Sequence, residues 1–136
     1  MVNIEDIPAE QRWEIAARAA SAVPFAYDIA FREAIGEKYD EMERPIYIEA
    51  GKEIKNLASA LGLPTGNARE IYETFGIIAT ILNGPELKGE TTEEGDDRTV
   101  GKTTQCPMLN RALEMGLDPK IVALTGCQTY HKSVIE

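Results

Sequence analysis

Apolar residues recur at intervals of three and four along most of this chain, a spacing that is typical of amphipathic α-helices. Proline, glycine and small polar residues interrupt the pattern at places where helices commonly begin and end. The pattern therefore predicts a mainly helical fold, in which Pro24 separates the first two helices. The expected helices cover residues 7–23, 24–36, 46–61, 67–82, 107–115 and 119–134, and the candidate entry to the third of them runs through Asp40 and Pro45.

Two of these segments carry informative apolar faces. One stripe of the first helix holds mainly alanine, which permits close approach of a neighbouring helix, and Trp13 is its one large anchor. We expect this stripe to face the core, and its members are Trp13, Ala16, Ala17, Ala20 and Val23. Helix 67–82 has an apolar arc that Tyr72, Ile77 and Ile81 broaden, so it is expected to be the most buried element.

The pattern changes over residues 86–105, where threonines surround the turn-forming sequence Glu94-Gly95-Asp96-Asp97. This composition predicts a two-stranded β-hairpin with an acidic tip. The tip lacks the spaced carboxylates and the closing glutamate of a calcium loop, so it is interpreted as a solvated turn. The expected fold class is mainly α: a single-domain helical bundle over residues 1–136, with one small β-hairpin before the last two helices.

Length and charge limit the classes of function. The 136 residues suit one domain, and a net charge of -9 with scattered lysines and arginines argues against nucleic-acid binding. No apolar run is long enough to span a bilayer, and the acidic N-terminal residues lack the basic region of a secretory signal. We therefore expect a cytoplasmic protein, with no membrane partner, that binds a small-molecule ligand or other proteins, including further copies of itself.

The chain contains two cysteines and one histidine, namely Cys106, Cys127 and His131. Cys106 precedes Pro107, and proline is favoured as the first residue of a helix, so Cys106 is expected at the N-cap. Free amides at a helix N-terminus favour a thiolate, the form of cysteine that attacks electrophiles and binds metals. The alternative is that Cys106 is a small buried apolar residue between hairpin and helix.

Cys127 and His131 are four residues apart and share one face of the last expected helix. Together with Cys106 they would supply three ligands that suit zinc or iron and leave one coordination position open for catalysis. Without a metal, His131 would take the proton from a thiol and leave a cysteine nucleophile. A disulfide between the cysteines, or a core cysteine beside a satisfied histidine, remains an alternative.

The order of these features resembles the L-2-amino-thiazoline-4-carboxylic acid hydrolase-like family over about residues 35–134. The motifs that carry the resemblance are Ile46-Tyr47-Ile-Glu-Ala-Gly51, Leu57-Ala-Ser-Ala-Leu-Gly-Leu-Pro64, a hairpin running into Thr104-Gln-Cys106-Pro107, then Gly116 and Cys127. The resemblance implies a helical body and hydrolytic opening of a sulfur-containing ring to an N-carbamoyl cysteine. Family members continue beyond the end of this chain, so it also implies a truncated C-terminus or a pocket wall from a second subunit.

Three hypotheses of function follow. The first is a small-molecule hydrolase acting on a C–N bond, with Cys106 as nucleophile or ligand, Cys127 as ligand or second thiol, and His131 as base or ligand. The second is a non-enzymatic binding or accessory protein in which the same residues hold a metal or respond to redox state. The third is a helical oligomerisation module whose cysteines are core residues.

Overall fold

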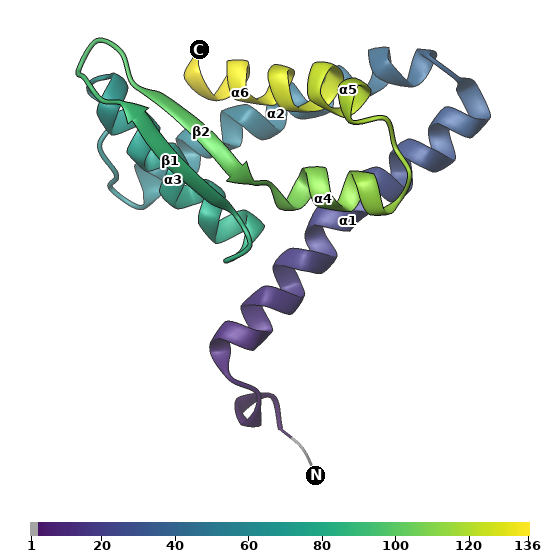
Figure 1. Ribbon diagram of the computed structural model, residues 1–136, viewed down its shortest axis with the longest axis horizontal. Coiled ribbons are helices and arrows are strands. Elements are labelled where there is room, and N and C mark those ends of the chain that lie inside the picture. Colours follow the sequence, from purple (N-terminus) through teal and green to yellow (C-terminus); the bar gives the residue numbers. More distant parts are fainter. Residues whose placement is uncertain (1–2) are drawn as a thin grey trace.

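The computed structural model describes residues 3–136 and confirms a mainly α fold with one β-hairpin before the last helices (Figure 1). A short 3₁₀ turn, η1 (Ile4–Asp6), precedes the first long helix. The helices are α1 (Ala9–Ile35), α2 (Lys38–Ala60), α3 (Ala68–Asn83), α4 (Pro107–Glu114), α5 (Pro119–Ile121) and α6 (Gln128–Ile135). A π-helical segment, η2 (Val122–Cys127), joins α5 to α6, and the strands are β1 (Lys88–Glu93) and β2 (Val100–Gln105).

The expected break at Pro24 is wrong, because α1 continues through it as one helix. Proline inside a helix removes one backbone hydrogen bond and costs roughly 3 kcal/mol. Here Ser21 and Phe25, on either side of the proline, are buried, and Phe25 packs in a core cluster with Ala112 and Val122. Tertiary packing therefore maintains the helix through Pro24, although proline usually ends or kinks a helix.

Two apolar clusters form the interior. The first comprises Ile54, Ala58, Ile78 and Val134, against which Leu63, Phe75 and Tyr130 pack. The second comprises Phe25, Ala112 and Val122, with Met108, Leu117 and Cys127 beside it. α6 lies along α2 (Figure 1), and Gly51 makes this close approach possible because a Cβ there would lie 2.7 Å from Ser133 Cβ.

The hairpin is antiparallel and its strands are mostly exposed, as expected for residues 86–105. It is tied to α3 at its tip, where the Ala68 amide donates to the Asp96 carbonyl oxygen at 2.8 Å and Arg69 pairs with Asp96 at 3.4 Å. The Tyr72 ring lies against Gly101 on β2, where no side chain would fit. These contacts fix the hairpin, whose second strand leads directly into α4.

Two of the expected apolar faces are only partly buried. In the stripe of the first helix Ala17 is buried and Trp13 half-buried, but the other members, Ala16, Ala20 and Val23, are exposed. In α3, Ile77 and Ile81 are exposed as well, so α3 is not enclosed on all sides. Trp13 still anchors α1 to α3, since its indole N–H donates to the Ile81 carbonyl oxygen at 2.9 Å.

Within residues 3–136, no helix combines the length and the apolar character that crossing a membrane requires.

Candidate functional site

Cys106 occupies the N-cap of α4, as the sequence predicts, and Pro107 is the first helical residue. The Leu109 amide donates a hydrogen bond to the Cys106 sulfur at 3.5 Å. A backbone amide in this position can stabilise negative charge on sulfur. Cys106 is half-buried, so its sulfur is held by the helix terminus without being sealed in the interior.

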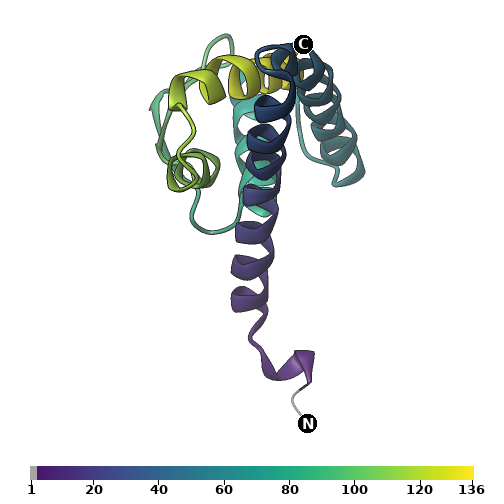
Figure 2. The same cartoon turned by 90° about the vertical axis from the view of Figure 1, so that its right-hand side faces the viewer.

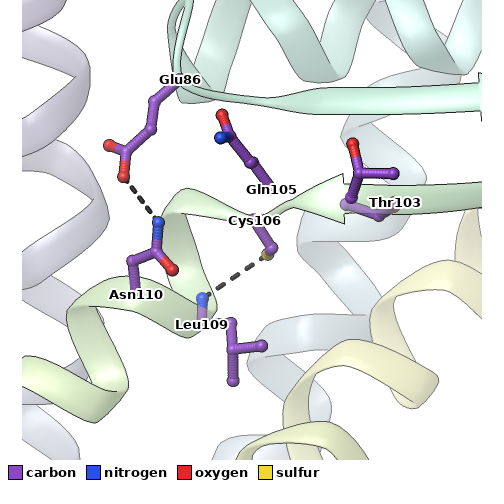
Figure 3. A pocket seen from close by; sticks show the side chains of 7 residues that line it. Glu86, Thr103, Gln105, Cys106, Leu109 and Asn110 are labelled. Carbon is purple, nitrogen blue, oxygen red and sulfur yellow. Dashed lines mark hydrogen bonds between the residues drawn. The ribbon is translucent and has the colours of Figure 1, made fainter.

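The Cys106 side chain lines a pocket of about 520 Å³ at the junction of β2 and α4 (Figure 3). A volume of this size lies in the range of small-molecule sites. Backbone and side chains from the loop after α3, from β2 and from α4 form its wall, and most of them are polar. The lining residues are Glu86, Thr103, Thr104, Gln105, Cys106, Leu109 and Asn110.

Glu86 is the second ionisable group of this lining, and its carboxylate is held from two sides. The Asn110 amide nitrogen donates to Glu86 Oε1 at 2.7 Å, an interaction visible in Figure 3. Arg111 Nη2 donates to the same oxygen at 2.9 Å, from a side chain that is only 4% exposed. The buried guanidinium thus compensates the negative charge and fixes the orientation of Glu86.

The sequence reasoning missed Glu86 because nothing local distinguishes it from the other acids among the 23 in the chain. Its partners Asn110 and Arg111 lie 24 and 25 residues away, so their contact depends on the fold. One local signal exists: Asn110 follows Cys106 by four residues, which places both on one face of α4.

Cys127, at the end of η2, packs in the second apolar cluster and does not line the Cys106 pocket. Burial raises the pKa of its thiol, and negative charge at Cys106 adds to this rise in pKa. At neutral pH Cys127 is therefore a neutral thiol. Both cysteines are free in this structure, so the disulfide alternative is not formed.

His131 lies with a different set of residues. Its ring meets the Phe75 ring edge-on, at 5.4 Å between ring centres and 87° between planes, and Tyr130 lies on another side at 5.6 Å. The aromatic rings shield the imidazole from part of the solvent, although the residue stays exposed, and this desolvation lowers the pKa of His131. Phe75 and Tyr130 belong to the first apolar cluster, whereas Cys127 belongs to the second.

The expected metal site from Cys106, Cys127 and His131 is not formed. Within residues 3–136, no group of three or more His, Cys, Asp or Glu side chains is arranged to hold a metal ion. The spacing of four between Cys127 and His131 does place them on successive turns. However, the thiol packs toward α1 and α4 while the imidazole packs toward α3, because each side chain follows its own apolar cluster.

A second group of polar residues lies inside the protein, beneath η2. Glu43 is 5% exposed, its Oε2 atom has no hydrogen-bond partner within the described chain, and burial raises the pKa of its carboxyl. The Tyr47 ring fills the space beside Gly126, where a Cβ would lie 3.0 Å from Tyr47 Cζ. The glycine in this helical segment, unusual by propensity, is therefore explained by the approach of a tyrosine.

Comparisons with protein-family models, with curated proteins and with solved structures find no match for this chain.

Proposed function

We propose that this protein is a hydrolase that breaks a C–N bond in a small molecule, with Cys106 as the nucleophile. One observation carries the proposal: the Cys106 sulfur accepts an amide hydrogen bond at a helix N-cap and also lines a pocket of about 520 Å³. Nucleophilic catalysis needs a thiolate that a substrate can reach, and these two properties supply stabilisation and access.

The reaction requires proton transfer in addition to a nucleophile. Glu86 shares the pocket wall with Cys106, and Asn110 and Arg111 fix the position of its side chain. In the proposed sequence Glu86 takes the thiol proton, sulfur attacks the carbon, and the departing nitrogen receives the proton as the C–N bond breaks. Water, deprotonated by Glu86, then displaces the sulfur and restores the thiol.

The polar lining favours a substrate with several hydrogen-bonding groups. Thr103, Thr104, Gln105 and Asn110 offer hydroxyl and amide groups around the sulfur. The resemblance to L-2-amino-thiazoline-4-carboxylic acid hydrolases names one such compound, a small ring that carries an amine and a carboxylate. Cys127 and His131 lie outside this lining, so the proposal gives them no contact with substrate.

The test is release of ammonia from L-2-amino-thiazoline-4-carboxylate, which breaks its exocyclic C–N bond, by wild-type protein, Cys106→Ser and Cys127→Ser. Opening of the ring to N-carbamoyl cysteine would break its C–S bond instead and would contradict the proposed bond. We expect Cys106→Ser to lower the rate at least about 100-fold, because a serine hydroxyl gives up its proton to Glu86 far less readily than a thiol does. Cys127→Ser is the matched control and should retain most activity at equal folded fraction. Hydrolysis that survives Cys106→Ser would rule out the assigned nucleophile.

A redox-responsive binding protein is the second candidate, because both cysteines are free thiols and neither is fully buried. In that case diamide would accept two electrons and two protons from the thiols, and Cys106 and Cys127 would join in a disulfide. Mass spectrometry of peptides after diamide treatment detects this bond. Its formation in the absence of any hydrolytic activity would favour the second candidate over the first.

A further inference from the structure

The outward face of α1 is apolar along nearly the whole helix. Its residues recur at intervals of four and three, which keeps them on a narrow strip of the helix surface. We call this strip the α1 seam; it comprises Ala16, Ala20, Val23, Tyr27, Ala30 and Ala34, all exposed. The opposite face of the same helix packs Ala17, Ser21 and Phe25 into the protein, so α1 is apolar on both sides.

A helix that is apolar all round is normally buried all round. Between Glu14 and Arg32 the only charged residues of α1 are Arg18 and Asp28, and neither lies on the seam. Arg18 pairs with Glu114 of α4 at 3.3 Å, and Asp28 is buried beside Arg32. No charge of this segment therefore interrupts the seam.

The accessible surface area of the chain also indicates that part of its surface is covered by another chain. Its accessible surface is 9067 Å², whereas a compact monomer of 15.0 kDa exposes about 7,000 Å². The excess of about 2,000 Å² is close to what one subunit of an obligate dimer buries. Figures 1 and 2 show part of the origin of this excess, since the N-terminal part of α1 extends beyond the rest of the molecule.

The residues of the α1 seam are arranged nearly symmetrically about its centre, which suits packing against the same seam of a second copy. Ala16 and Ala30 lie at equal distances along the sequence before and after Val23. Ala20 and Tyr27 lie at nearly equal distances before and after it. An antiparallel partner related by a two-fold axis would place Val23 against the partner's Val23, with alanines opposite one another or opposite the tyrosine. Small side chains at these positions let two helix backbones approach closely.

The charges at the two ends of the seam are complementary in the same arrangement. Arg12 lies at one end and Glu33 at the other, and within residues 3–136 neither makes an ion pair. The Nε atom of Arg12 also lacks a hydrogen-bond partner. An antiparallel pairing centred on Val23 would bring Arg12 of each copy near Glu33 of the other, twice by symmetry.

We propose that the α1 seam is the interface of a homodimer in which two copies of α1 pack antiparallel about Val23. The dimer would bury Ala16, Ala20 and Val23, which the sequence marks as core and which the single chain leaves exposed. This proposal rests on residues outside the Cys106 pocket and stands or falls independently of the hydrolase activity.

The first experiment measures the mass of the full chain by sedimentation equilibrium. Wild-type protein at about 10 µM should have twice the mass of one chain. Val23→Glu should weaken association at least about 100-fold, because it brings two carboxylates together inside an apolar contact. Ile77→Glu on α3 is the matched control, since Ile77 is 48% exposed and Val23 50%, and it should leave the dimer intact.

The second experiment tests the antiparallel arrangement. Glu33→Arg should weaken the dimer about 10-fold, because it places two arginines together at each end of the seam. Adding Arg12→Glu should restore wild-type association. Wild-type protein that remains a single chain at about 100 µM overturns the proposal, as does a dimer that Val23→Glu leaves unchanged. A double variant that stays weak overturns the antiparallel pairing.

Discussion

The two cysteines of this protein differ because of what surrounds each sulfur. Cys106 receives an amide hydrogen bond from Leu109 and lines a pocket. Cys127 packs among apolar side chains, which raises the pKa of its thiol. The same residue type is therefore placed for chemistry at one position and for packing at the other.

Glu43 gives a prediction about stability and pH. Burial raises the pKa of its carboxyl above the ordinary value of 4.5, and the negative charge of Asp28 adds to the rise. As the pH increases above 4.5, the unfolded chain therefore loses this proton more readily than the folded protein, and the free energy of unfolding falls. We expect Glu43→Gln, which cannot ionise, to raise that free energy by about 1 kcal/mol near pH 7 and to change it little near pH 4.

Urea denaturation at the two pH values measures this effect. Glu53→Gln is the control, because Glu53 is an exposed glutamate on the same helix, and it should show no comparable difference between the two pH values. An equal change for Glu43→Gln at both pH values would mean that the ionisation of Glu43 does not oppose folding.

Single residues also show which features of the site could be predicted from the sequence. The N-cap position of Cys106 was predictable because it depends only on the proline that follows. The contact of Glu86 with Arg111 was not predictable, since it joins residues 25 positions apart. The prediction that Cys127 and His131 share a site with Cys106 fails for the same reason. Their spacing along the helix predicts that the two residues are close, but it does not predict which apolar cluster each side chain packs against.

At the scale of elements, the close packing of α2 and α6 depends on Gly51. A Cβ at this position would lie 2.7 Å from Ser133 Cβ and 2.8 Å from the Tyr130 carbonyl oxygen. We expect Gly51→Ala to lower the free energy of unfolding by about 2 kcal/mol, because two helices must separate to admit one methyl group.

Gly76, in the middle of α3, provides the opposite case. A Cβ at Gly76 would meet no atom within 4 Å, so Gly76→Ala should raise the free energy of unfolding by about 1 kcal/mol through its better helix propensity. Urea denaturation of the two variants measures both changes. Equal effects of the two substitutions would contradict the described contact between α2 and α6.

Element boundaries were predictable where the chain itself ends a helix. Gly36, Gly84 and Gly116 all have positive φ angles and lie at or just beyond the ends of α1, α3 and α4, as the sequence predicts. Pro24 misled the same reasoning, because it lies inside α1, and Pro45, expected near the start of a helix, lies inside α2. A glycine that ends a helix acts locally, whereas the tolerance of a proline depends on neighbours such as Phe25 that pack elsewhere in the fold.

At the scale of the whole molecule, the sequence predicts the fold class and the order of elements but not the surface that remains exposed. Ala16, Ala20 and Val23 follow a core-like spacing, yet they are exposed in the single chain. The proposed antiparallel dimer accounts for this difference, because the spacing then describes burial in an assembly. Periodicity in a sequence predicts that a face is covered, and it cannot tell whether the same chain or a second copy covers it.

The proposed chemistry of the whole molecule depends on Cys106, and the alkylation rates of the two cysteines test this most directly. Wild-type protein is treated with limiting iodoacetamide at neutral pH, and the peptides carrying Cys106 and Cys127 are quantified by mass spectrometry. We expect Cys106 to react at least about 10-fold faster, and L-2-amino-thiazoline-4-carboxylate to protect it without protecting Cys127. Equal rates, or faster alkylation of Cys127, would contradict the placement of the reactive thiol at the N-terminus of α4.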